Sequence, residues 1–270
     1  MSTALTAVSF ATVASRSYID QAAGLLINLR QYYPNSEIVI CALDDATEQA
    51  FSRTDDQNLT CVPAITVWGE KYWRNLTCRM SIAERAFASK AAVATWVLET
   101  RHVPVLLLDS DLLFLTSIND VIGRLDTHPL LLVPARHPWV HWRKSAQFGL
   151  FSAGLLGANE GALPALRAWR AMCFEACMAT KLSGLYYEQK YLDYFISVNG
   201  LYILTDPGIN VSQTLLNLLQ PRKNEDESWS LKDGTPLRVF HCSRTTDDRL
   251  ELARLKRVYN RDGMEKIGMP

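Results

Sequence analysis

The chain has 270 residues, 48% of them hydrophobic, and its 28 basic residues balance its 28 acidic ones. This length allows one large domain or two small ones, and we expect one elaborated domain. The balanced charge provides no overall field to attract nucleic acid or an anionic membrane, so any phosphate recognition must be local. The N-terminus lacks the basic start and long apolar region of a signal peptide, and no apolar run approaches the roughly 18 residues of a membrane span. We therefore expect a cytoplasmic protein without a transmembrane segment.

The hydrophobic pattern of the first half predicts a β-α-β start and a parallel sheet. The expected elements are a strand at 4–14, a helix at 18–32, a strand at 37–43, an alanine-rich helix at 80–100 and a strand at 103–108. The last two follow each other directly, so the helix leads into a buried strand.

The second half predicts alternating strands and helices around one polar interruption. The expected elements are strands at 129–134 and 149–156, helices at 163–178 and 187–198, strands at 201–205 and 237–241, and a charged amphipathic helix at 247–259. The polar segment 220–230 predicts a mobile surface loop rather than a domain linker.

The cysteines are scattered among apolar residues and include no C-x-x-C pair. This distribution predicts reduced core thiols rather than a disulfide or zinc framework. Cys173 and Cys177 share a helical face, but two ligands do not make a zinc site.

The most informative feature is the run V-P-V-L-L-L-D-S-D-L-L-F-L at 103–115, which sets Asp109 and Asp111 at the end of an apolar strand. An ionised carboxylate there needs a cation or many donors to compensate it. The carboxyl ends of strands line the ligand crevice of open α/β sheets, and two nearby oxygen ligands suit a hard divalent cation bound to a substrate phosphate. The alternative is that both acids solvate a turn or cap a helix beginning near Thr116.

Several other motifs accompany this pair in a defined order. They are A-T-V-A-S-R-S-Y at 11–18, D-S-D at 109–111, F-S-A-G-L-L-G-A at 151–158, E-Q-K-Y-L-D at 188–193, G-I-N-V-S at 208–212 and V-F-H-C-S at 239–243. In this order they resemble the GT-A-fold nucleotide-sugar glycosyltransferases, particularly the family that contains glycogenin and the lipooligosaccharide galactosyltransferases, over nearly the entire chain. The resemblance implies an α/β fold with a mostly parallel, Rossmann-like sheet flanked by helices. It also implies one domain over 1–270, with a nucleotide-binding half (1–120) and a sugar- and acceptor-binding half (121–270) that includes the C-terminal helix.

The resemblance further implies that Asp109, Asp111 and His241 hold Mn²⁺ or Mg²⁺ against the diphosphate of the donor. An imidazole beside two carboxylates favours Mn²⁺ over an all-oxygen calcium site and is compatible with Mg²⁺. The ion would act as a Lewis acid on the departing nucleotide diphosphate. Taken alone, His241 could equally be a hydrogen-bonded core residue.

By the same resemblance, Glu188 and Gln189 match an acidic-Gln pair, usually Asp-Gln, which in retaining relatives steadies an oxocarbenium-like centre. Glutamate in place of aspartate moves the carboxylate outward by about one methylene. Glu188 could also be a helix N-terminal acid that interacts with the dipole. Ala153 and Gly154 correspond to positions near the donor hexose, although glycine in a strand can also mark a bulge or tight packing. Ser152 replaces an asparagine that is common in the family, which leaves the identity of the hexose open.

The remaining site residues implied by the resemblance contact the nucleotide. They are Ala11, Thr12, Tyr18 and Asp44 for uracil and ribose, Lys90 and Arg244 for the diphosphate, and Ser110 as a further cofactor-binding residue. Tyr18 could instead be a packing aromatic, Lys90 could lie on a solvated helix face, and Arg244 could cap the surface. The run H-P-W-V-H-W-R-K at 137–144 combines aromatic and cationic side chains and predicts an acceptor-side loop.

The predicted function is metal-dependent transfer of a hexose, from a donor we expect to be UDP-linked, to a saccharide acceptor with retention, in bacterial surface-glycan synthesis. A lipid-linked acceptor would bring the protein to a membrane surface. The alternatives are an inactive sugar- or nucleotide-binding protein of the same fold and a haloacid-dehalogenase-like phosphatase with Asp109 as nucleophile. The phosphatase motif normally continues with Gly-Thr, whereas Leu112 and Leu113 follow here. A nucleotidyltransferase would need a glycine-rich phosphate loop, which the N-terminus lacks.

Overall fold

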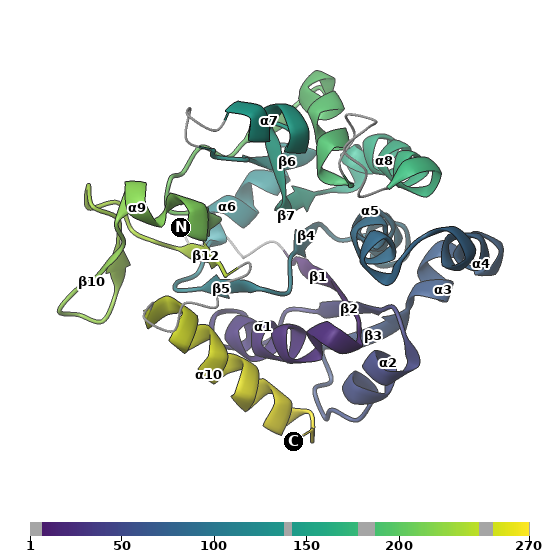
Figure 1. The fold of residues 1–270 in the computed structure, drawn as a ribbon, viewed down its shortest axis with the longest axis horizontal. Coiled ribbons are helices and arrows are strands. Elements are labelled where there is room, and N and C mark those ends of the chain that lie inside the picture. The colour runs from purple at the N-terminus through teal and green to yellow at the C-terminus, as the bar shows by residue number, and fades with distance from the viewer. Residues whose placement is uncertain (1–6, 138–141, 178–186, 243–250, 270) are drawn as a thin grey trace.

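The computed structural model describes residues 7–137, 142–177, 187–242 and 251–269, and its central feature is a sheet between layers of helices (Figure 1). Within these residues the sheet has seven strands in the order β3-β2-β1-β4-β7-β6-β8. Their bounds are β1 (Ser9–Ala14), β2 (Ile38–Ala42), β3 (Leu59–Pro63), β4 (Val105–Leu108), β6 (Leu130–Pro134), β7 (Phe151–Ala158) and β8 (Leu201–Ile203).

The sheet is mostly parallel. β1 pairs in parallel with β2 and β4, β2 with β3, and β6 with β8, whereas β7 runs antiparallel between β4 and β6. The chain winds outward from β1 to β3 and then returns to place β4 on the other side of β1. The strand order therefore reverses between β1 and β4. In open α/β sheets, ligands bind beside such a reversal point, at the carboxyl ends of the strands. The predicted α/β fold with a mostly parallel sheet is confirmed.

Helices cover both faces of this sheet. The α-helices are α1 (Ile19–Tyr32), α2 (Asp45–Ser52), α3 (Ala64–Trp68), α4 (Glu70–Arg79), α5 (Ile82–Arg101), α6 (Asn119–Ile122), α7 (Trp142–Phe148), α8 (Leu163–Ala176), α9 (Leu216–Leu219) and α10 (Glu251–Lys266). The 3₁₀ helices are η1 (Arg16–Tyr18), η2 (Gly123–Asp126), η4 (Glu160–Ala162), η6 (Gln189–Ser197) and η7 (Gln213–Leu215). In the described part of the chain, none of these helices has the length and apolar character needed to span a bilayer.

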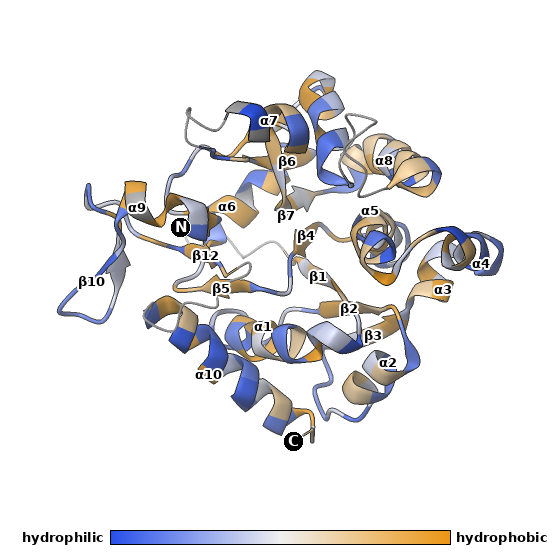
Figure 2. Cartoon of the chain, viewed as in Figure 1, coloured by the Kyte–Doolittle hydropathy of each residue, from blue (hydrophilic) through white to orange (hydrophobic). Residues whose placement is uncertain are grey.

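Two apolar cores hold the layers together. One includes alanines of α5 and Trp169 of α8, packed on the sheet, and the other includes Leu25 and Leu29 of α1 on the opposite face. Figure 2 shows the strands largely in hydrophobic colours, while α10 carries much hydrophilic colour. Strands covered on both faces form continuous apolar runs, which is why the sequence predicted them well.

The helix α5 is well delimited by its sequence. Ser81 Oγ accepts a hydrogen bond from Glu84 N at 3.3 Å, and the Glu84 carboxylate accepts one from Ser81 N at 2.9 Å. This capping box satisfies N–H groups that the first helical turn leaves free. The helix ends at His102, whose left-handed backbone (φ 54°) stops it just before β4.

A second, smaller sheet joins the middle of the chain to its late part. It contains β5 (Leu112–Phe114), β12 (Val239–His241) and β9 (Val211–Ser212), with β12 in the centre. β12 pairs antiparallel with β5 so that His241 lies opposite Leu112. On α1, the buried Asn28 donates to Phe114 O at 3.0 Å and accepts from Phe114 N at 2.7 Å, which anchors β5 to the first helix.

The helix α10 packs directly against α1. A Cβ atom on Gly263 would lie 2.4 Å from the carbonyl carbon of Ala23, and one on Gly24 would lie 2.2 Å from Asn260 Oδ1. Since real Cβ atoms do not approach so closely, glycine at both positions lets the two helices meet nearly backbone to backbone. At the far end of this contact, Tyr259 OH and Gln31 Oε1 are hydrogen-bonded at 2.6 Å.

Parts of the sequence prediction were incomplete or wrong. The prediction contained no elements at the positions of α2, β3, α3 and α4. The segment expected to be a loop at 220–230 contains two short paired strands, β10 (Arg222–Lys223) and β11 (Trp229–Ser230). Between them, Ser228 N donates to Asp226 Oδ1 and Asn224 N donates to Ser228 O, so the polar residues form the turn of a hairpin. The helix expected at 187–198 is the 3₁₀ helix η6.

The cysteine prediction holds for most positions. All six cysteines are free, and four of them are buried. Cys78 on α4 is exposed and Cys61 on β3 is partly exposed, so these two are not core thiols as predicted.

Candidate active site

The turn between β4 and β5 carries the two predicted acids. Asp109 directly follows β4 and Asp111 directly precedes β5. Leu112 N donates to Asp109 O at 3.2 Å and closes the turn, while Asp109 N donates to Gly154 O of β7 at 2.9 Å. Cys242 N, next to β12, donates to Asp111 O at 3.0 Å. Both sheets therefore hold the backbone of this turn.

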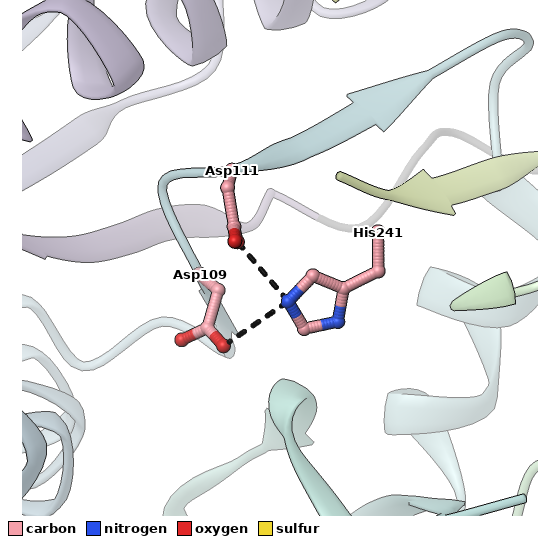
Figure 3. Close-up of side chains that lie close together, drawn as sticks. All are labelled: Asp109, Asp111 and His241. Atoms are coloured by element: carbon pink, nitrogen blue, oxygen red, sulfur yellow. Dashed lines mark ion pairs between the residues drawn. The ribbon is translucent and has the colours of Figure 1, made fainter. Parts of the chain in front are cut away.

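The side chains of Asp109, Asp111 and His241 converge (Figure 3). His241 Nε2 lies 3.1 Å from Asp111 Oδ1 and 3.6 Å from Asp109 Oδ2. The antiparallel register of β5 and β12 produces this meeting, because it sets His241 opposite the residue that follows Asp111. The three side chains are only 14% to 22% exposed, which leaves access for a ligand at an otherwise enclosed site.

Asn210 fixes the orientation of the His241 ring. Its Oδ1 lies 2.9 Å from His241 Nδ1. A carbonyl oxygen only accepts, so Nδ1 carries the proton, and in the neutral ring the bare Nε2 faces the carboxylates. Asn210 has a left-handed backbone (φ 56°), a conformation that asparagine tolerates better than most residues. The G-I-N-V-S motif had signalled this region, but the role of Asn210 was not predicted.

This donor set fits a divalent cation. Adjacent ligands of an octahedral ion with bonds of about 2.1 Å lie about 3 Å apart, and the ligand atoms of Asp109, Asp111 and His241 all lie within 4.8 Å of one another. Two carboxylates and one imidazole are suitable for Mn²⁺ or Mg²⁺. The residues present therefore agree with the metal site predicted from the sequence.

Neighbouring charges shift the pKa values of Asp111 and His241. Burial alone would raise the pKa of Asp111, but His241, Lys256 and Lys90 together lower it to about 2. Burial alone would lower the pKa of His241, but the neighbouring Asp111 and Asp109 outweigh it and raise the pKa. The carboxylates thus favour a proton on the ring, and a cation held by these residues would have to displace that proton.

Gly154 on β7 leaves room for this cluster. A Cβ atom at Gly154 would lie 2.7 Å from His241 Cε1 and 3.1 Å from Asp109 Oδ2. The sequence prediction placed Ala153 and Gly154 near the donor hexose. The structure gives an additional reason for glycine, because any larger residue would enter the space of His241 and Asp109, two of the predicted metal ligands.

We expect Gly154→Ala to weaken Mn²⁺ binding by about tenfold or more, because the new methyl group must displace the His241 ring. Gly123→Ala is the matched control, since a Cβ there meets nothing within 4 Å and its backbone is already helical. Calorimetric titration with Mn²⁺ measures both affinities, and circular dichroism checks the fold. Equal affinities in the two variants would contradict the steric argument.

Lys90 on α5 is buried beside the acids and does not lie on a solvated helix face. Its Nζ is 2.5 Å from Asp109 Oδ1 and 2.9 Å from Glu188 Oε1. Burial alone would lower the pKa of Lys90, but the two carboxylates outweigh it and raise the pKa above its ordinary value. Lys90 therefore connects the turn that carries Asp109 and Asp111 to the segment that carries the predicted catalytic pair.

That pair lies at the start of η6. The Glu188 side chain is 3% exposed and pairs with Lys90, and its backbone carbonyl accepts from Trp169 Nε1 at 3.0 Å. Glu188 lies at the N-terminal end of η6, as the helix-dipole alternative expects, but its side chain makes no capping bond to the helix. Gln189 Oε1 accepts from Ala153 N at 3.3 Å, and its Nε2 donates to Phe148 O at 3.0 Å. The first bond attaches Gln189 to β7 next to Gly154, and the second attaches it to the end of α7.

The predicted nucleotide residues form a second group around β1 and β2. Ala11 and Thr12 are buried within β1, and Thr12 Oγ1 has no hydrogen-bond partner among the described residues. Tyr18 at the end of η1 is 54% exposed, which does not support the packing alternative. Their contact with a nucleotide stays a prediction.

Asp44 has a structural role that the sequence prediction did not include. Its Oδ1 accepts from Thr47 N at 2.9 Å and caps α2, and its Oδ2 accepts from Arg16 N at 2.9 Å. Burial alone would raise the pKa of Asp44, but the hydrogen bonds from Arg16 and Thr47 outweigh it and lower the pKa. The carboxylate thus links the ends of β1 and β2, and its predicted role in nucleotide binding remains to be tested.

Two predictions fall partly or wholly outside the described residues. Arg244 lies outside them, as does the segment 138–141 of the predicted acceptor-side loop. Ser110 is described and nearly buried, and its backbone carbonyl accepts a hydrogen bond from Lys256 of α10. Lys256 was not predicted as part of the site.

A mostly parallel sheet with an Asp-Ser-Asp turn at the carboxyl end of β4 and a histidine from a late strand defines the GT-A class of fold. Three solved glycosyltransferases are similar to the chain. The galactosyltransferase LgtC in complex with donor and acceptor sugar analogues has a TM-score of 0.57 and 14% identity, covering 96% of this chain and 95% of the other. Mouse xyloside xylosyltransferase 1 has a TM-score of 0.54 and 10% identity, covering 89% and 98%. A glycosyltransferase involved in glycosylation of the major capsid of PBCV-1 has a TM-score of 0.55 and 12% identity, covering 94% and 98%.

These similarities confirm the predicted resemblance at the level of the fold. Among curated proteins, the uncharacterized protein YfnF of Bacillus subtilis (strain 168) is 23% identical over 247 residues, which cover 87% of this chain and 80% of YfnF. No family model matches the sequence.

Proposed function

We propose that this protein is a metal-dependent glycosyltransferase that moves a hexose from a nucleotide sugar, UDP-linked, to a saccharide acceptor. The convergence of Asp109, Asp111 and His241 at the carboxyl end of β4, in a GT-A fold, is the observation that carries this proposal. Three donor atoms of this kind suit a cation that also binds a diphosphate.

In the proposed mechanism, Asp109, Asp111 and His241 would hold Mn²⁺ or Mg²⁺. The bound ion supplies Lewis-acid stabilisation of the negative charge on the departing nucleotide diphosphate. Asn210 keeps the proton on Nδ1, so the unprotonated Nε2 of the neutral ring would be available to the ion. The chain itself therefore sets the orientation of the His241 ring.

Lys90, Glu188 and Gln189 carry the sugar side of the proposed mechanism. Lys90 is paired with both Asp109 and Glu188, so the metal-binding turn and the catalytic segment stay in one arrangement. Glu188 and Gln189 would lie beside the anomeric carbon and stabilise positive charge that develops there. By the family resemblance, the anomeric configuration would be retained on transfer. Ala153 would contact the hexose.

The resemblance also bears on the acceptor and on the location of the protein. We propose a saccharide acceptor, free or lipid-linked, in bacterial surface-glycan synthesis, and a cytoplasmic location. A lipid-linked acceptor would require contact with a membrane surface, which the chain would make peripherally.

The test is a panel of UDP-, GDP- and dTDP-hexoses with Mn²⁺, Mg²⁺ or EDTA. We expect one donor to raise the melting temperature only when Mn²⁺ or Mg²⁺ is present, since a ligand at 100 times its Kd adds about 2.7 kcal/mol to the unfolding free energy. The same donor should release its nucleotide diphosphate slowly with water and faster with a saccharide acceptor. Phosphate release from simple monoesters would support the phosphatase instead, and binding without turnover would support the inactive binding protein.

A further inference from the structure

A buried lysine from the late part of the chain lies behind the metal-binding turn. Lys256 on α10 is 3% exposed, and its Nζ donates to Ser110 O and Leu112 O, both at 3.0 Å. A third contact runs to Gln21 O at 3.4 Å. The ammonium thus binds the carbonyl groups on both sides of Asp111.

This ammonium has an unusual environment. Across the described residues, its recorded hydrogen bonds all go to backbone carbonyls and no ion pair with a carboxylate is found. Burial lowers the pKa of Lys256 to about 8, despite the opposing charges of Cys242, Asp111 and Asp20. A buried cation without a paired acid costs free energy. The hydrogen bonds that Lys256 donates to the turn offset part of this free-energy cost.

The bonds from Lys256 complete the hydrogen bonding of the turn. Asp109 O accepts from Leu112 N, and Asp111 O accepts from Cys242 N. The carbonyls of Ser110 and Leu112 accept hydrogen bonds from Lys256 Nζ. Each of the four carbonyls from 109 to 112 therefore has a donor, and one side chain supplies two of them.

The position of Lys256 is itself well fixed. The close contacts of Gly263 with Ala23 and of Gly24 with Asn260 seat α10 on α1 with little freedom to slide. Because α1 also holds β5 through Asn28 and Phe114, α1 connects α10 to the strand that follows the turn.

We propose that Lys256 is a positioning residue that fixes the backbone around Asp111, so that the carboxylates of the turn point at His241 before a cation binds. This inference rests on the proposed function for its consequence, which is tighter metal binding through a preorganised site. Lys256 itself touches neither the cation nor the donor in this scheme.

The experiment compares Lys256→Met with Lys266→Met. Methionine has a similar length but no hydrogen to donate, and Lys266 is an exposed lysine of the same helix. Mn²⁺ affinity is measured by electron paramagnetic resonance of free Mn²⁺. Amide hydrogen exchange without metal is measured on peptides that cover residues 109–113. Lys256→Arg, which keeps the charge and several donors, tests for rescue.

We expect Lys256→Met to raise the Kd for Mn²⁺ by about 10- to 100-fold, the range typical of residues that orient metal ligands. Exchange at 109–113 should become about tenfold faster while exchange in β2 stays unchanged. Lys266→Met should behave as the wild type, and Lys256→Arg should recover part of both losses.

A lower melting temperature with unchanged Kd and unchanged exchange at 109–113 would overturn the inference, because it would show a purely structural role. If the wild type fails to bind Mn²⁺, the proposed metal dependence is wrong. The exchange data still decide whether Lys256 holds the turn. If Lys256→Met does not fold, Lys256→Leu, which also has no hydrogen to donate, takes its place with the same two criteria.

Discussion

Asp111→Ala is expected to lower metal-dependent turnover by about 10²- to 10³-fold, the loss typical when one stabilising group of a transition state is removed. Asp111 Oδ1 lies 3.1 Å from His241 Nε2, so its loss removes one of the three ligands and leaves His241 without its nearest carboxylate. With a pKa of about 2, the Asp111 carboxylate is ionised over the whole physiological range and needs no prior deprotonation.

The matched control is Asp55→Ala, because Asp55 is an exposed acid far from β4 in the sequence. Nucleotide release with Mn²⁺, Mn²⁺ affinity and melting temperature are measured for both variants. The backbone contacts of the turn do not involve the Asp111 carboxylate, so the fold should survive. Wild-type turnover in Asp111→Ala would refute the proposed metal site.

Lys90→Met should have the largest effect on stability, with a loss of about 3–5 kcal/mol, because it leaves buried carboxylates without their counter-charge. Lys90 and Glu188 are 10% and 3% exposed, so solvent cannot replace the lost ammonium. Urea denaturation measures the free energy of unfolding. Arg167→Met is the control, since the Arg167–Glu99 pair is largely exposed and such pairs contribute about 0–1 kcal/mol.

A double-mutant cycle identifies the cause of that loss. Glu188→Gln combined with Lys90→Met removes one of the uncompensated acids, so the double variant should recover about 1–3 kcal/mol relative to Lys90→Met alone. Strict additivity of the two single changes would show that Lys90 and Glu188 do not interact, contrary to the 2.9 Å contact between them.

The strands that the sequence predicted best are those buried on both faces. The runs around Ile38 to Ala42 and Val105 to Leu108 are apolar without interruption, and that pattern depends only on local sequence. The helix α4 was missed because nearly all of its residues are exposed and few of them are apolar. In the 220–230 segment, the polar residues indicated a loop, although side-chain bonds of Asp226 and Ser228 make them a hairpin turn.

The sequence predicted which residues form the candidate site but not the contacts that bring them together. The order of motifs identified Asp109, Asp111 and His241, yet their meeting depends on the pairing of β5 with β12, which local sequence does not reveal. For Asp44, the position was identified but its contacts were not. A carboxylate after a strand has the same sequence pattern whether it caps a helix, as Asp44 caps α2, or binds a nucleotide. Lys256 lies on the same face of α10 as the buried Leu252 and Asn260, and local sequence does not reveal which groups that face meets in the fold.

The pairing of β5 with β12 also bears on when the site forms during synthesis. A ribosome-bound chain that ends before β12 contains both aspartates but lacks His241, and one that ends before α10 lacks Lys256 as well. Domains emerge from the ribosome N-terminal part first, so the early sheet can form while the cation site is still incomplete. A growing polypeptide is therefore expected to remain inert toward activated sugars until the segment from β12 through α10 has been released.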